Sequence, residues 1–342
     1  MSVPREPGQD PLAPPLPWQR PQWQRLVELQ QQQKLAHALL LSGPQGIGKR
    51  CFAERLAAWL LCHQPGREQA CGACRSCGWI RAGTHPDLFW LLPESPARVI
   101  KIDQVREANE FMQLSAQAGH GKVVIIDPAD QLNRNAANAL LKSLEEPAAE
   151  RWLLLVSSRY GMLLPTIVSR CQRLTMVEPT APQAQAWLRD HTDAELPWDE
   201  ILAASRNRPL RALDLAREPL WKQYNRALTL LSAISTGRSD PLLLAEGGEQ
   251  FDPELLLDWW WGWLVAAIRL ASGLAADLPL PTELTTRAGQ ASPLALFDFL
   301  NRLEQARTIQ GQQITLNRSL LLGDLALRWR DAFARRQPLQ MG

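Results

Sequence analysis

The stretch GPQGIGKR at residues 43–50 comes close to a nucleotide-binding P-loop, the pattern G-x-x-x-x-G-K followed by Ser or Thr. Backbone N–H groups of such a loop can wrap phosphates, and its lysine can neutralise them. The residues that would form this cradle are Gly43, Gly46, Gly48 and Lys49. Arg50 stands where a hydroxyl would coordinate Mg²⁺, and a guanidinium is a cation that only donates hydrogen bonds. The motif therefore predicts a phosphate cradle that lacks one metal ligand.

A second acidic motif, KVVIIDPAD at residues 122–130, supplies the other half of such a site. Asp127 ends an apolar run, as the second metal-site carboxylate should. Pro128 follows it, where related ATPases carry the glutamate that activates water. The two departures together predict a site that does not hydrolyse ATP by itself. Nucleotide binding stays open, because Arg50 could either add a favourable charge or fill the metal's place.

Four of the six cysteines form a cluster with the spacing C-x8-C-x2-C-x2-C: Cys62, Cys71, Cys74 and Cys77. Two-residue spacers let successive thiolates turn onto one cation, and four soft ligands in a tetrahedron suit Zn²⁺. Reduced thiols, a disulfide pair or an iron–sulfur cluster are the alternatives. Since protein ligands would fill all four positions, the metal is expected to be structural.

Length and composition set limits on the class of protein. With 342 residues and 46% hydrophobic residues, the chain is expected to form two or three ordinary globular domains. A net charge of +2 gives no argument for a strongly basic nucleic-acid binder. The longest apolar run, residues 259–268, is shorter than the roughly 20 residues of a membrane-spanning helix. The first 18 residues lack the apolar stretch of a signal peptide, so a cytoplasmic location is expected.

The elements that would position these groups change in character along the chain. Up to about Met176, helical stretches alternate with continuous apolar runs, which predicts a parallel sheet covered by helices on both faces. The predicted strands are residues 38–43, 87–92, 122–127 and 152–158. After Glu178-Pro179 only helical patterns follow, interrupted by STGRSDP at residues 235–241, a predicted linker.

Several motifs recur in one order and resemble a known family: LAHALLLSGPQGIGKR, the four-cysteine insert, AGTHPDL, KIDQVRE, ANALLKSLEEP and VSRCQRL. Together they resemble the bacterial clamp loaders of the AAA+ class, which serve DNA polymerase III. The resemblance is dense over residues 18–176 and covers the remainder by length and layout. In that family the ATP-hydrolysing subunit, gamma or tau, keeps Ser or Thr after the lysine and an acidic pair after the strand. This chain has neither, so it resembles the partner regarded as the stator.

The resemblance implies a fold and a division into domains. The expected fold is α/β, a P-loop AAA+ domain with a parallel sheet and a zinc-binding insert, followed by a small helical lid and an all-helical C-terminal collar. The expected boundaries are a flexible N-terminal arm at 1–17, the AAA+ domain at 18–177 with the zinc module at 62–77, the lid at 178–238 and the oligomerisation collar at 239–342.

The resemblance also implies roles for two arginines. Arg170, in the SRC motif, would point at ATP held by a neighbouring subunit and act there in trans as an arginine finger. A planar, permanently charged guanidinium suits phosphate oxygens on which charge builds. Arg211 occupies the position of the sensor arginine that touches the subunit's own nucleotide, although an ordinary surface arginine is an equal reading.

The implied partners are the gamma or tau and delta subunits and, indirectly, the sliding clamp and primed DNA. The chain would then be a component of the DNA polymerase III holoenzyme, a nucleotidyltransferase, rather than an ATPase on its own. Two alternatives remain: a catalytically active AAA+ ATPase of the gamma or tau type, and a zinc-containing DNA-binding protein.

Overall fold

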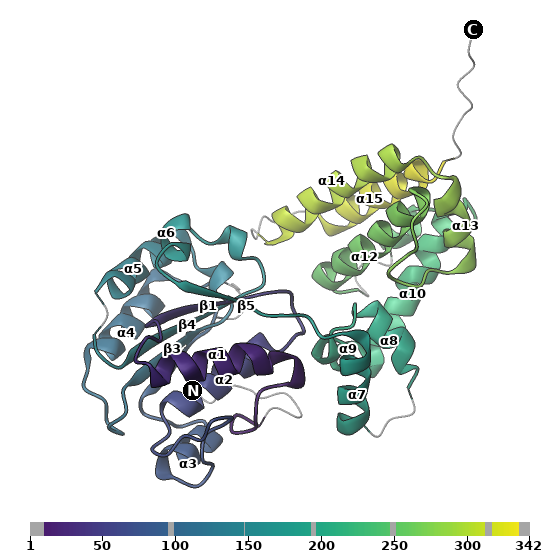
Figure 1. Ribbon diagram of the computed structural model, residues 1–342. Coiled ribbons are helices and arrows are strands. Elements are labelled where there is room, and N and C mark those ends of the chain that lie inside the picture. Colours follow the sequence, from purple (N-terminus) through teal and green to yellow (C-terminus); the bar gives the residue numbers. More distant parts are fainter. Residues whose placement is uncertain are drawn as a thin grey trace. The chain divides into compact units, whose positions relative to one another are not determined.

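The computed structural model describes residues 10–94, 99–146, 148–192, 196–246, 251–311 and 317–334. These residues form two compact units, shown in Figure 1. The first contains the described residues up to 192 together with Arg208–Arg211, and the second contains the rest. Within the described residues no helix is both long and apolar enough to cross a bilayer.

The first unit is built on a five-stranded sheet whose strands all run parallel. The strands are β1 (Ala38–Ser42), β2 (Leu88–Leu91), β3 (Lys122–Ile126), β4 (Arg151–Ser157) and β5 (Gln172–Thr175). Their order across the sheet is β2-β3-β4-β1-β5. The strands β3, β4 and β1 are neighbours and parallel, so their carboxyl ends lie side by side. The P-loop after β1 and the acidic motif after β3 are therefore close together.

Helices cover both faces of this sheet, as the continuous apolar strands require. Leu39 and Leu41 of β1 pack with Phe52 and Leu56 of the helix after the P-loop. Leu40, pointing the other way, packs in a second core with residues of α4 (Ile102–Gln113), α5 (Arg134–Glu145) and α6 (Pro165–Val168). The helices of this unit are η1 (Pro17–Gln19), α1 (Arg20–Gln31), α2 (Lys49–Leu60), α3 (Arg75–Ala82), α4 (Ile102–Gln113), η2 (Ala129–Gln131), α5 (Arg134–Glu145), η3 (Tyr160–Met162), α6 (Pro165–Val168) and α7 (Ala181–His191).

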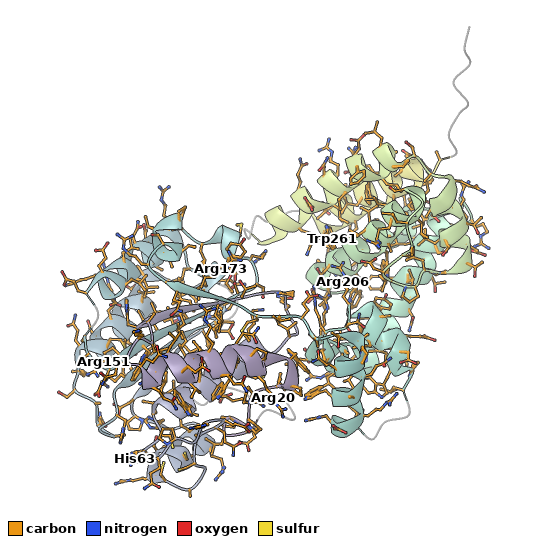
Figure 2. The ribbon with its side chains drawn as sticks, viewed as in Figure 1. Arg20, His63, Arg151, Arg173, Arg206 and Trp261 are labelled. Atoms are coloured by element: carbon orange, nitrogen blue, oxygen red, sulfur yellow. The ribbon has the colours of Figure 1, made fainter. Side chains whose placement is uncertain are left out.

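The second unit is entirely helical in its described part. Its helices are α8 (Trp198–Ala204), α10 (Glu218–Ser235), α11 (Leu242–Glu246), α12 (Pro253–Ala271), α13 (Thr282–Gln290), α14 (Pro293–Gly311) and α15 (Arg318–Ala332), and α9 (Pro209–Leu215) is shared with the first unit. Helix α12 carries four closely spaced tryptophans, of which Trp259, Trp260 and Trp263 are buried. The Arg206 guanidinium lies 4.3 Å from the ring centroid of the remaining one, Trp261 (Figure 2).

Three details differ from the sequence predictions. Residues 10–17 were expected to belong to a flexible arm, but Leu12 and Leu16 are buried, and residues 1–9 lie outside the described residues. The helical pattern of residues 211–231 is divided between two helices, since α9 ends at Leu215 and α10 begins at Glu218 with Pro219 in its first turn. An edge strand, β5, follows the SRC motif and was not predicted. The three-domain division at 177 and 238 stays a prediction.

Candidate nucleotide and metal sites

The P-loop connects β1 to α2, and its glycines are required by both conformation and space. Gly46 and Gly48 have φ angles of +80° and +85°, a region that disfavours side chains. A Cβ on Gly46 would lie 2.4 Å from the Cβ of Arg211, and one on Gly48 would lie 2.5 Å from Cδ1 of Leu16. The loop therefore has the expected shape, and Arg211 packs directly against it.

Two side chains from the segment before α1 donate hydrogen bonds to backbone carbonyls of the P-loop. Trp18 Nε1 donates to the Ile47 carbonyl at 3.0 Å, and Gln19 Nε2 donates to the carbonyls of Ile47 and Gly48 at 2.9 and 3.0 Å. Both side chains are buried. Sequence reasoning missed these two residues, because neither belongs to a recognisable phosphate-binding pattern.

Lys49 is buried at the start of α2 with hydrogen bonds inside the chain. Its Nζ donates to the Pro44 carbonyl at 2.6 Å and to Ser158 Oγ at 2.9 Å. Burial lowers the pKa of Lys49 to about 8, and Arg208 adds to that effect, whereas Asp127 and Asp130 oppose it. The ammonium group of Lys49 thus lies in an environment that disfavours its charge, at the predicted phosphate cradle.

Arg50 is paired with the carboxylate that a metal would need. Its Nε lies 3.6 Å from Asp127 Oδ2, and its guanidinium carbon lies 5.2 Å from the centroid of the Trp90 ring. The side chain that replaces the metal-binding hydroxyl therefore places positive charge beside the second metal-site residue. Both interpretations of Arg50, an added charge and a replacement for the metal, stay predictions, and the contact with Asp127 favours the second.

The other carboxylate of the acidic motif is also engaged. Asp130 accepts hydrogen bonds from Ser157 Oγ at 2.6 Å and from the backbone N–H of Ser158 at 3.1 Å, and Arg159 Nε lies 3.4 Å from it. Asp130 thus orients the end of β4, where Ser158 meets Lys49.

Arg170 makes contacts with a different set of residues. Its Nη2 lies 2.7 Å from Glu145 Oε1, and its Nη1 donates to the Thr166 carbonyl at 3.0 Å. Both Arg170 and Glu145 are exposed, at the ends of α6 and α5. The arginine is accessible to another molecule but already has a carboxylate partner.

The four clustered cysteines converge as a tetrahedral metal site would. Cys62 follows α2, Cys74 is the N-cap of α3, and Cys77 lies in its first turn. The Sγ–Sγ separations are 3.9 Å for Cys62–Cys74 and for Cys71–Cys77, 3.7 Å for Cys62–Cys77, and 3.5 Å for Cys74–Cys77. A tetrahedron of thiolates about 2.3 Å from zinc has sulfur atoms about 3.8 Å apart, so the group fits.

Backbone N–H groups within the cluster also favour thiolates. The N–H of Cys71 donates to Cys62 Sγ, and that of Cys74 donates to Cys71 Sγ, both at 3.3 Å. The hydrogen bonds from Ala73 and Cys74 lower the pKa of Cys71 to about 6. Burial raises the pKa of Cys77, so a cation is needed to hold all four groups as thiolates.

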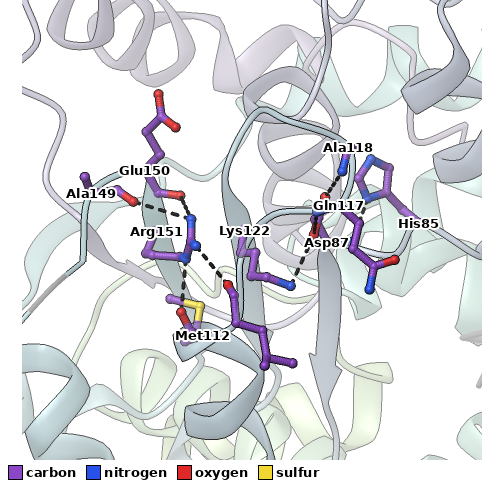
Figure 3. A network of polar contacts seen from close by, with 10 residues as sticks. His85, Asp87, Met112, Gln117, Ala118, Lys122, Ala149, Glu150 and Arg151 are labelled. Carbon is purple, nitrogen blue, oxygen red and sulfur yellow. Dashed lines mark hydrogen bonds and ion pairs between the residues drawn. The ribbon is translucent and has the colours of Figure 1, made fainter.

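Asp87 and Lys122 belong to a network of polar contacts, shown with His85 in Figure 3. Lys122 Nζ, at the start of β3, lies 3.1 Å from Asp87 Oδ1 and 3.9 Å from the centroid of the Phe111 ring. Asp87 also accepts from the backbone N–H groups of Gln117 and Ala118, at 2.9 and 2.7 Å. Burial raises the pKa of Asp87, but these hydrogen bonds and Lys122 outweigh it and leave the pKa below its usual value.

His85 extends the network to α3, the helix that carries Cys77. Nδ1 accepts from the Asp87 N–H at 3.0 Å, so Nε2 carries the proton and donates to Ser76 Oγ, 2.8 Å away. Ser76 in turn donates to the Leu61 carbonyl at 2.7 Å. Burial lowers the pKa of His85 to about 4, which keeps the ring neutral. The AGTHPDL motif therefore has a structural explanation: it joins α3 to the sheet.

The sheet order, the P-loop after β1 and the acidic motif after β3 define a P-loop protein of the AAA+ class, with a four-cysteine insert and a helical C-terminal region. Two family models match the chain: "DNA polymerase III, delta subunit" over residues 18–180 and "DNA polymerase III, delta subunit, C terminal" over residues 218–331.

Curated relatives agree with these models. The chain is 39% identical to the DNA polymerase III subunit delta' of Pseudomonas aeruginosa, covering 92% of this chain and 96% of the relative. It is 34% identical to the subunit of the same name from Escherichia coli, covering 91% and 94%. The chain belongs to the delta-prime subunit family of DNA polymerase III. A solved gamma-subunit-related protein of Thermotoga maritima overlaps with a TM-score of 0.49 at 18% identity, covering 92% of this chain and 99% of that one, a likeness that adds nothing to the assignment.

Proposed function

We propose that this chain is the non-hydrolysing stator subunit of the DNA polymerase III clamp loader. It assembles with the gamma or tau and delta subunits in the cytoplasm and supports loading of the sliding clamp onto primed DNA. It supplies Arg170 to the ATP site of its neighbour. The delta-prime family assignment supports this placement, and the chain's own contacts support each part of the mechanism.

The observation that carries the non-hydrolysing role is the Arg50–Asp127 pair. A hydrolytic P-loop site needs Mg²⁺ between the residue after the lysine and the acidic motif. Here a guanidinium lies 3.6 Å from the Asp127 carboxylate, so a divalent cation would meet positive charge at its own ligand. Pro128 has no side chain that could take a proton from water. The chain therefore lacks both the arrangement that would hold Mg²⁺ and a residue that would activate the attacking water.

The role in trans is supported by the exposure and chemistry of Arg170. It follows α6 on the surface, with its backbone anchored by the buried Ile167 three residues earlier. An arginine held this way can reach the phosphates of a second subunit without rearrangement of the core. In related nucleotide hydrolases an arginine finger contributes about 10³ to 10⁵ in rate.

The test is Arg170→Ala in the fully reconstituted loader. Hydrolysis at the site that Arg170 faces is expected to fall by about 10³-fold, measured as ATP turnover with assembly verified by size-exclusion chromatography. Arg106→Ala is the matched control, because Arg106 is also exposed and paired with a carboxylate, Asp103. An unchanged rate in an intact complex would rule out the role of Arg170.

We also propose zinc as the ion held by the cysteine cluster. Four thiolates at tetrahedral separations prefer a soft or borderline cation, and no position is left for substrate. The ion would stabilise the loop between α2 and α3 and take no part in catalysis.

A further inference from the structure

We propose that Glu145 is a competing partner of Arg170, which the phosphates of the neighbouring subunit's nucleotide must displace. The inference rests on the proposed action of Arg170 in trans and concerns how that action is made dependent on nucleotide. Glu145 thereby acts through Arg170 as a positioning residue.

The pair is brought together by rigid parts of the fold. Leu144, just before Glu145, is buried in the same apolar core as Ile167, which precedes Arg170 by three residues. The two backbones are therefore fixed, while both charged groups are exposed at the surface. Glu145 Oε1 and Arg170 Nη2 are 2.7 Å apart, a short charge-assisted contact.

The position of Glu145 gives its own helix no benefit. It is the last residue of α5, and Glu146 follows as the C-cap. Carboxylates at a helix C-terminus face the negative end of the helix dipole and are unfavourable there. The contact that compensates Glu145 is the one to Arg170, since no other ion pair of Glu145 occurs among the described residues.

The balance between the two partners can change when a phosphate arrives. An exposed carboxylate–guanidinium pair contributes little in water, about 0.2–1 kcal/mol. A nucleotide polyphosphate carries more charge and accepts from two guanidinium N–H groups at once, so it displaces a single carboxylate oxygen. Glu145 then holds Arg170 while no nucleotide is present and yields when one binds.

The experiment compares Glu145→Gln with Glu146→Gln in the reconstituted loader, each alone and combined with Arg170→Ala. Glu145→Gln removes the competing charge and is expected to raise kcat/KM for ATP about two- to fivefold without lowering kcat. Glu146→Gln makes the same charge change at an exposed neighbour that has no ion pair among the described residues, and is expected to have no effect. The gain from Glu145→Gln should vanish in the Arg170→Ala background.

Each other outcome contradicts the inference. An unchanged kcat/KM means that Glu145 does not compete, and a lower kcat means that it supports the active orientation instead. An equal gain without Arg170 means a general charge effect. Arg170→Ala alone separates the two claims: if it lowers the rate while Glu145→Gln changes nothing, the trans role stands and the competition fails.

Discussion

Two buried lysines of the α/β unit lie in contrasting environments. Lys122, at the start of β3, is 1% exposed and faces Asp87, which is also fully buried and receives two backbone hydrogen bonds. Lys49, at the start of α2, is 6% exposed and is held by a carbonyl and a hydroxyl, with carboxylates only at longer range. Both are cations removed from water, but only the first has an ionised partner in contact.

The difference separates a structural charge from a charge that we propose is functional. Burying a charge is costly unless it is paired, so the Lys122–Asp87 pair belongs to the stable framework that carries the cysteine module. Lys49 is kept charged at a site where its own environment opposes the charge, which is typical of a group arranged for an external anion. Lys49 therefore stays the predicted phosphate-binding residue of the P-loop, and the replacement of the metal by Arg50 stays part of the proposed function.

The largest loss of stability is expected when the proposed metal is removed from the four-cysteine cluster. Structural zinc contributes apparent binding free energies of roughly 10 kcal/mol or more in small domains, so chelation or Cys71→Ser should destabilise the first unit severely. Thermal unfolding with parallel metal analysis measures this. Cys171→Ser, outside the cluster, is the control and should retain the metal. Equal stability with and without metal would contradict a structural role.

Breaking the framework ion pair is expected to rank second. Lys122→Met leaves the Asp87 carboxylate buried without its cation, which typically costs about 3–5 kcal/mol. Equilibrium urea unfolding measures the loss. Adding Asp87→Ala should recover part of it, because no charge then remains buried. If the double variant is as unstable as the sum of both single variants, the two residues do not act as a pair.

The sequence predicted the strands and the cysteine cluster better than it predicted the contacts between distant residues. Four continuous apolar runs led to β1–β4 because strands buried on both faces leave that pattern. β5 escaped because its residues alternate in burial and include Arg173, as on a sheet edge. The four cysteines were found from spacing alone, because two-residue spacers let successive thiolates reach one ion.

Contacts between distant segments could not be derived from local patterns. Nothing in the sequence indicates that Gln19 would fix the carbonyls of the P-loop, or that Glu145 would meet Arg170. His85 belonged to a recognised motif but had no assigned role until the fold brought Ser76 and Asp87 to its two nitrogens. The sequence likewise left two interpretations of Arg50, and only its position beside Asp127 favours one.

Replacing Lys49, the buried lysine of the P-loop, should raise the free energy of unfolding, whereas replacing Lys122 should lower it. Lys49→Met removes a charge that burial penalises, so it is expected to raise stability by up to about 3 kcal/mol at pH 7. Because the folded pKa is about 8 and the ordinary value 10.5, the gain is complete below pH 8 and disappears as the pH rises toward 10.5. Urea unfolding across this pH range measures it. Lys34→Met, at an exposed lysine, should show no such trend. Destabilisation at pH 7 would mean that Lys49, like Lys122, is a charge that stabilises the fold.

The smallest effect is expected from replacing Arg50. It tests whether the P-loop can bind nucleotide phosphates independently of a metal ion at Asp127. Arg50→Thr removes the guanidinium beside Asp127 and introduces a hydroxyl, so Mg²⁺ should then strengthen nucleotide binding about tenfold, the size of one good charge-assisted contact. Fluorescent-nucleotide titrations of the isolated chain with Mg²⁺ or EDTA measure this, and Arg50→Lys, which keeps the cation, should remain insensitive to Mg²⁺. ATP turnover should stay absent in every variant, because Pro128 still offers no base. Magnesium-dependent binding by the unmodified chain would contradict the assignment of Arg50 to the metal's place, since Asp127 would then be available despite the guanidinium 3.6 Å away.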